Sequence, residues 1–165
     1  MKNEKQFLEI YNEFSQLVYN LSLSYLQNIE DSKEATQDVF VKIHTKLEGF
    51  NNKSSLKTWI YRITINHCLD VIKSKNRKYR LFFTRENEDY DSKDFNHPGA
   101  KLESKEEMEK IFREINKLPE KQKTALILKT IEGIPQKEIA TVMKMNEKAV
   151  ESLLTRARKK LKEKL

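Results

Sequence analysis

Hydrophobic residues in the first half of the chain recur at the spacing of amphipathic helices. Over residues 4–27 the intervals alternate between four and three, which predicts one helix with an apolar stripe of Phe7, Tyr11, Phe14, Val18, Leu21 and Tyr25. A second helix is expected at about 32–47, after a start signal at Asp31 and Glu34 and before Gly49. Its predicted buried side consists of Ala35, Val39, Ile43 and Leu47.

A third helix should begin after residues 51–53, with Ser54 or Ser55 as its N-cap. Its inward-facing residues are predicted to be Leu56, Trp59, Ile60, Ile63, Cys68 and Val71. Three helices with matching apolar faces are enough for a small bundle.

The second half of the chain predicts shorter helices. One is expected at about 105–117, with an apolar side of Met108, Ile111, Phe112 and Ile115. The next begins at Pro119 and ends at Gly133, and it would bury Ala125, Leu128 and Ile131.

Residues 134–161 have the pattern of a helix-turn-helix. The first helix should start at Pro135, and its apolar side is formed by Ile139, Ala140, Val142 and Met143. Asn146 stands at the N-cap of the second helix, whose buried stripe is Val150, Leu154, Ala157 and Leu161. The opposite side is basic and polar, which is typical of a helix that binds DNA. An ordinary helical hairpin with a solvated lysine face is the alternative.

Charge changes sharply between the two halves. From Lys73 to Arg85 there are six basic residues, no acidic residue and interleaved aromatics, which suits a nucleic acid; a solvated helix end is the alternative. Acidic residues predominate from Glu86 to Ser104 without a helical stripe. We therefore predict an all-α protein with two small helical domains, residues 1–80 and 105–165. A flexible acidic linker at 81–104 joins them, and the second domain ends in the helix-turn-helix.

Composition narrows the class of function. A net charge of +7 favours a polyanionic partner, either nucleic acid or an acidic membrane. A single cysteine, Cys68, fits a reducing cytoplasm, and the sequence has neither a signal-peptide core nor an apolar run of membrane-spanning length. Three glycines leave no nucleotide-binding loop, and neither metal-ligand spacing nor a catalytic cluster occurs. We expect a soluble, intracellular protein without metal, cofactor, small-molecule substrate or catalysis.

Five segments in order carry a family resemblance. They are E-A-T-Q-D-V-F-V-K-I at 34–43, L-K-T-W-I-Y-R-I-T-I-N at 56–66, L-P-E-K-Q-K at 118–123, G-I-P-Q-K-E-I-A at 133–140 and V-E-S-L-L-T-R-A-R-K-K-L at 150–161. Together they resemble bacterial sigma factors of the sigma-70 superfamily, of the short extracytoplasmic-function type. The resemblance implies a cytoplasmic subunit that binds core RNA polymerase, recognises and melts promoter DNA and starts transcription of a specific regulon. Because such proteins are often held inactive by an anti-sigma protein, commonly at the membrane, that partner is implied too.

The resemblance also implies three sets of binding residues. The exposed edge of the second helix would dock on core RNA polymerase through Glu34, Gln37, Asp38, Val41 and Lys42. At the −10 element, Asn66 would hold a base turned out of the stack, and phosphates would be bound by Lys73, Lys75, Arg77 and Lys78. The last helix would enter the major groove at the −35 element, with contacts from Lys148, Ser152, Thr155, Arg156 and Lys159.

Two positions in the last helix depart from the family pattern. Family members commonly have Lys or Arg where this chain has Glu151, and Arg where it has Leu153. Glu151 cannot hold a phosphate; it could accept a hydrogen bond from cytosine N4, or it could point to solvent.

Two other function classes fit part of this pattern. A transcriptional regulator that binds DNA by itself would need the helix-turn-helix, but neither the 34–43 helix nor the 56–66 motif. A nucleic-acid enzyme would need a catalytic cluster, and none is found in the sequence.

Overall fold

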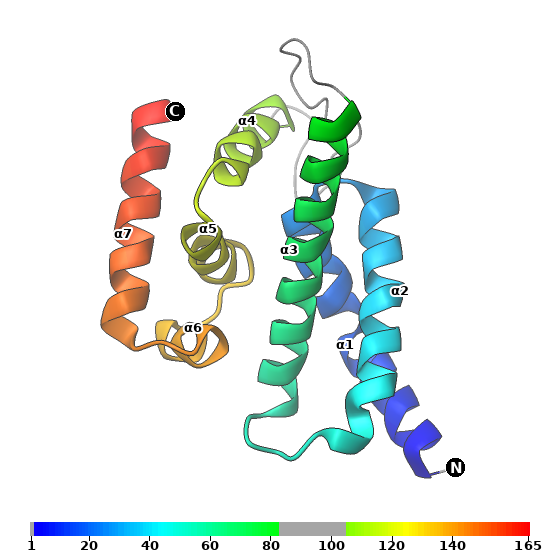
Figure 1. Cartoon of the computed structure of the whole chain (residues 1–165). Helices are drawn as coiled ribbons and strands as arrows, with labels where there is room; N and C mark the ends of the chain where they lie inside the picture. Colours follow the sequence, from blue (N-terminus) through cyan, green and yellow to red (C-terminus); the bar gives the residue numbers. More distant parts are fainter. Residues whose placement is uncertain (1, 83–104) are drawn as a thin grey trace. The chain divides into compact units, whose positions relative to one another are not determined.

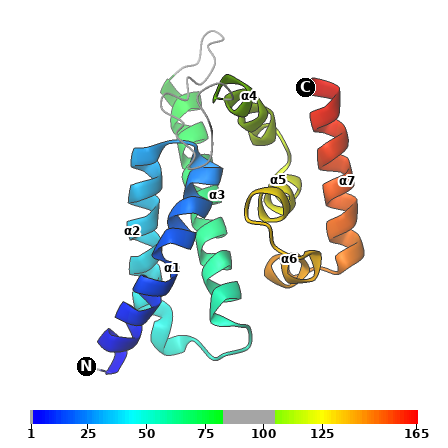
Figure 2. The same ribbon diagram turned by 180° about the vertical axis from the view of Figure 1, so that it is seen from behind.

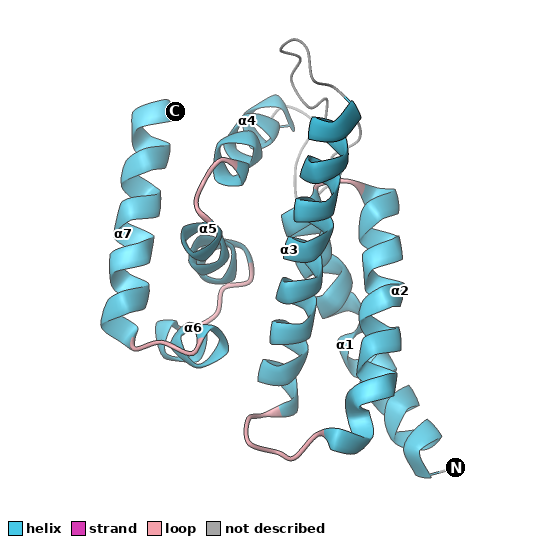
Figure 3. Ribbon diagram, in the orientation of Figure 1, coloured by secondary structure: helices cyan, strands magenta, loops and turns pink. Residues whose placement is uncertain are grey.

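The computed structural model describes residues 2–82 and 105–165 (Figure 1). Every regular element in these ranges is helical, as Figure 3 shows, so the all-α prediction is confirmed. The chain divides into two compact units, Met1–Phe95 and Asn96–Leu165. The predicted linker at 81–104 lies outside the described residues, except that Leu81 and Phe82 continue the third helix. Within the described ranges, no helix is both long and apolar enough to cross a bilayer.

The described part of the first unit, residues 2–82, is a three-helix bundle. It consists of α1 (Lys2–Leu26), α2 (Ile29–Lys46), a short 3-10 turn η1 (Leu47–Gly49) and α3 (Leu56–Phe82). Each helix packs on the other two. Figures 1 and 2 show α2 and α3 side by side, with α1 crossing them at an angle.

The core of this bundle confirms most of the predicted apolar stripes. Phe14, Val18, Val39 and Ile43 are buried together. Tyr11 is the exception, because 44% of its surface is exposed and its ring lies edge-on to Phe40 at 4.8 Å. A straight helix drifts by about 20° per heptad relative to a strict 3.5-residue repeat, which turns Tyr11 to the rim and brings Ile10 inward.

Two helix starts are set by side-chain caps. Asn28 precedes α2, and its side chain accepts a hydrogen bond from the Asp31 amide at 2.9 Å. The helix therefore begins three residues earlier than predicted, because Gln27 takes a left-handed conformation (φ 52°) that ends α1 and leaves Asn28 as the cap. Of the two serines predicted to cap α3, Ser55 does so, accepting from the Thr58 amide at 3.1 Å.

Over residues 105–165, the second unit contains four α-helices and one π-helical turn: α4 (Lys105–Asn116), α5 (Glu120–Leu126), η3 (Ile127–Ile131), α6 (Gln136–Met143) and α7 (Glu147–Lys164). The last helix, α7, packs on α5, α6 and α4. Pro119 and Pro135 stand at the N-caps of α5 and α6, so each of these helices begins one residue later than predicted. The predicted apolar stripe of α7 is buried at Val150, Leu154 and Ala157.

Candidate functional site

The exposed side of α2 carries five residues singled out in the sequence, which we call the α2 edge: Glu34, Gln37, Asp38, Val41 and Lys42. The first four are exposed and Lys42 is half-buried. Ala35, Val39 and Ile43 occupy the buried side of the same helix, so the edge faces outward. Val41 is 64% exposed, which leaves one branched apolar side chain among charged and amide groups. Such a mixture suits a reversible protein interface with few anchors.

His67 joins this edge to α3. Its Nδ1 lies 2.9 Å from the Lys42 ammonium, and its Nε2 lies 3.5 Å from a carboxylate oxygen of Asp38. The ring is 8% exposed. Burial lowers the pKa of His67, and the charge of Lys42 lowers it further, against the opposing effects of Asp38 and Asp70. Helical spacing along the sequence pairs His67 with Asp70, three residues later, but not with Asp38, which lies on another helix.

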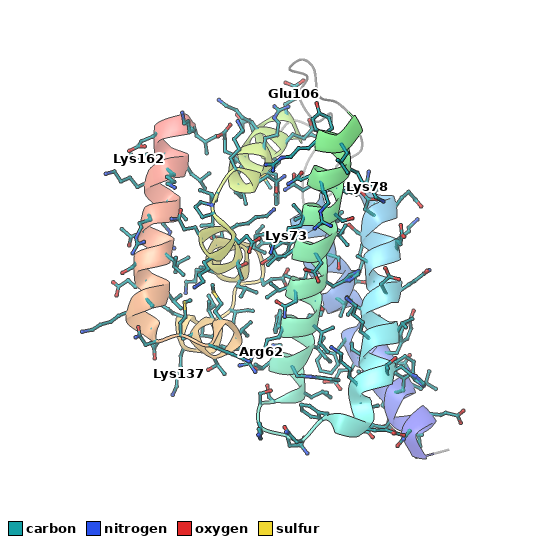
Figure 4. All side chains as sticks on the ribbon, viewed as in Figure 1. Arg62, Lys73, Lys78, Glu106, Lys137 and Lys162 are labelled. Atoms are coloured by element: carbon teal, nitrogen blue, oxygen red, sulfur yellow. The ribbon has the colours of Figure 1, made fainter. Side chains whose placement is uncertain are left out.

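On α3, Asn66, Lys73 and Arg77 are exposed and share one side of the helix, since they are seven and four residues apart. Asn66 is exposed and stands between buried Ile65 and His67, so it lies opposite the buried side of α3 at this point of the helix. Figure 4 shows Lys73 and Lys78 along the C-terminal half of α3. We call Asn66, Lys73 and Arg77 the α3 face.

Two other basic residues of α3, Lys75 and Arg62, lie near the α3 face in the sequence. Lys75 is half-buried on the opposite side of the helix, and its ammonium forms an ion pair with Asp31 at the start of α2. The structure therefore does not bring Lys75 together with the α3 face. Arg62 lies four residues before Asn66 on the same side of α3. This helical spacing could have identified Arg62 as a further candidate for −10 binding.

On α7, all five residues predicted to contact DNA are exposed, and we call them the α7 face: Lys148, Ser152, Thr155, Arg156 and Lys159. The Asn146 side chain caps the helix by accepting from the Ala149 amide at 2.8 Å. Gln136 at the start of α6 donates to the Glu147 carbonyl at 3.0 Å. The first bond closes the first turn of α7, and the second joins that turn to α6.

The turn between the end of α6 and the start of α7 is short. Lys144 adopts a left-handed conformation with φ 54° and ends α6. A shallow hollow at this turn is lined partly by Lys137, Thr141 and Lys144. Of the two positions that depart from the family pattern, Glu151 is exposed and Leu153 is half-buried.

Metal-ligating groups do not cluster in the described ranges: no set of three His, Cys, Asp or Glu residues there could hold an ion. Cys68 is buried, and its thiol lies 3.7 Å from the Ser22 hydroxyl. Another histidine, His97, lies outside the described residues.

Comparisons with known proteins agree with this arrangement. The family model for sigma-70 region 2 matches residues 10–78, and the model for sigma-70 region 4 matches residues 108–161. The chain is 27% identical over 169 residues to the ECF RNA polymerase sigma-E factor of Haemophilus influenzae, covering 99% of this chain and 89% of that protein. It is 27% identical over 162 residues to the RNA polymerase sigma factor YlaC of Bacillus subtilis, covering 98% and 93%.

The fold is similar to that of a solved sigma factor, RpoE of Bartonella quintana in complex with the anti-sigma factor NepR. That comparison has a TM-score of 0.73 and 19% identity, and it covers 96% of both chains. The chain belongs to the sigma-70 family and is a sigma factor of the extracytoplasmic-function type, which acts in promoter recognition at the start of transcription.

Proposed function

We propose that this sigma factor docks on core RNA polymerase through the α2 edge and reads its promoters at two points, with the α3 face and the α7 face. The observation that carries the proposal is the outward direction of Asn66 and of all five α7 residues. Each lies on a helix whose opposite side is buried in its own unit. Exposed polar groups on rigid helices are well suited to contact DNA.

The α3 face provides the −10 contact. The Asn66 amide can donate and accept at the edge of an unpaired base, and Lys73 and Arg77 can neutralise phosphates beside it. Binding to the melted strand offsets the loss of base pairing, so the protein captures an open state without hydrolysing ATP. Lys75 takes part here only after its ion pair with Asp31 is broken. Lys78, exposed farther around the helix, adds to phosphate binding.

The α7 face provides the −35 contact. Arg156 and Lys148 supply positive charge, while Ser152 and Thr155 supply hydroxyl groups that can bond to base edges or phosphates. Exposed Glu151 beside them repels phosphate and favours a cytosine N4 donor.

The domain boundaries, cellular setting and partners complete the proposal. Residues 1–80 form the core-binding and −10 domain, residues 105–165 the −35 domain, and residues 81–104 the linker between them. The protein works in the bacterial cytoplasm as a binding subunit without catalytic activity of its own. The structure of RpoE bound to NepR supports an anti-sigma partner here as well, which could hold the protein at the inner membrane.

Reconstituted transcription tests the proposal. Core RNA polymerase is mixed with the full chain and a library of bacterial genomic fragments, and the 5′ ends of the transcripts are mapped. The proposal expects starts that depend on the protein and share two upstream elements. If the protein instead binds no core enzyme but binds a duplex operator tightly, it is a stand-alone regulator. Turnover of labelled RNA or DNA by the protein alone would contradict the non-catalytic role.

A further inference from the structure

Lys42, His67 and Asp38 form a polar chain across the packed surfaces of α2 and α3, which we call the His67 cluster. Lys42 and Asp38 are four residues apart on α2, so both reach the same imidazole from one side of that helix. The ring itself is almost completely buried, whereas the Asp38 side chain is 53% exposed. A buried group therefore touches two members of the α2 edge.

The hydrogen-bond partners determine where the ring proton lies. A lysine ammonium can only donate, so His67 Nδ1 accepts and is unprotonated. In a neutral imidazole the proton then sits on Nε2, which has no hydrogen-bond partner in the described part of the chain. The Asp38 carboxylate lies 3.5 Å away, slightly too far for a well-formed bond. Since an unsatisfied buried donor is costly, a small rotation of Asp38 toward His67 is favoured.

We propose that neutral His67 is a positioning residue for the α2 edge, holding Lys42 and Asp38 in the arrangement that docks on core RNA polymerase. This inference rests on the proposed function of that edge. Long charged side chains lose freedom when an interface forms, and holding them beforehand reduces that loss. His67 can do this for both residues while presenting almost no surface to the polymerase itself.

Protonation of His67 disrupts this arrangement. An imidazolium carries hydrogen on both nitrogens, so Nδ1 can no longer accept from Lys42, and two positive groups then lie 2.9 Å apart. Asp38 on α2 and Asp70 on α3 favour the charged ring, but burial and Lys42 outweigh them, and the pKa of His67 in the folded chain is lowered from 6.5. The unfolded chain therefore binds this proton first as pH falls, and folding stability declines with pH below about 6.5. Core binding should weaken over the same range.

Two substitutions in the full chain test the role of His67 by competition for core RNA polymerase. His67→Leu removes the hydrogen bond with Lys42 and the contact with Asp38. We expect binding about threefold to tenfold weaker, the loss that mobilising one or two long side chains entails. His67→Gln keeps an acceptor and donors, and should restore most of the affinity. At saturating protein, transcription should reach the wild-type level with both variants, because Asn66 is unchanged.

The pH profile gives a second measurement. Wild-type core binding should fall more steeply than that of His67→Gln as the pH falls below about 6.5, because the pKa of His67 in the folded chain is lowered from that value. Identical profiles overturn the proposal. This measurement also decides the question if His67→Leu proves unfolded by circular dichroism.

A protein that lacks the charges of both Asp38 and Lys42 distinguishes a positioning role of His67 from a general role in packing. If His67→Leu weakens core binding equally in an Asp38→Asn/Lys42→Met protein, His67 acts only in packing and the proposal is overturned; loss of the effect in that background supports it. Asp38→Arg distinguishes this failure from failure of the α2 edge. Unchanged core binding by Asp38→Arg contradicts the edge and this inference together, whereas a loss with Asp38→Arg but not with His67→Leu contradicts only the role of His67.

Discussion

Replacing Asn66 with alanine should make the first unit more stable and the sigma factor less active. Asn66 is exposed within α3, where asparagine is a weaker helix former than alanine. The substitution should therefore stabilise the unit by about 0.5 kcal/mol, which corresponds to a rise of roughly 2–4 °C in its unfolding temperature. An amide that makes two bonds to a base contributes about 1–3 kcal/mol of discrimination, so promoter opening should fall by about fivefold to 150-fold.

Three measurements on the same preparation check this prediction: thermal unfolding followed by circular dichroism, competition for core RNA polymerase, and promoter opening followed by abortive initiation. Asn12→Ala is a matched control, because Asn12 is also an exposed asparagine within a helix, on α1. It should give a similar gain in stability without a change in opening. Core binding should remain at the wild-type level for both variants.

If Asn66 contacts a base, Asn66→Ala should raise the unfolding temperature and lower promoter opening. Wild-type opening by Asn66→Ala would refute it, because the amide would then make no contact that matters for melting. Equal losses of opening and core binding would also refute it, because they would indicate a general defect in the first unit.

Three further predictions concern the other surfaces. Asp38→Arg should weaken core binding, because it reverses an exposed charge of the α2 edge; unchanged competition for core would contradict the α2 edge. Arg156→Ala should cost about 1–3 kcal/mol in binding to −35 duplexes and relax specificity at one base pair. A uniform loss on all duplexes in a binding titration would instead make Arg156 a phosphate contact. Asn146→Ala should destabilise the second unit by about 1 kcal/mol in thermal unfolding, since it removes the cap of α7; an unchanged transition would rule out that contribution.

Local patterns predicted the helices and most of their buried sides. The stripe of α7 is an example, because Val150, Leu154 and Ala157 repeat at intervals that a helix places on one side. The Asn146 cap was equally predictable, since capping depends on a residue and the amide three positions later. The outward direction of the α7 face follows from the same periodicity. Asn66 does not follow from it, because it lies seven residues after Trp59, which was predicted to face inward, and yet it is exposed.

Contacts between helices could not be read from these patterns. Lys75 belongs to a basic run in the sequence, yet it pairs with Asp31, 44 residues earlier. His67 meets Lys42 across 25 residues, and Tyr11 turns outward although it continues an apolar repeat.

The sequence by itself therefore determined the helices, most of their buried sides and the cap of α7, because each depends on neighbours within about one helical turn. The tertiary structure alone decided which charges face solvent and which join α2 to α3. Those contacts depend on the relative rotation and register of packed helices, which the packing of the whole bundle sets.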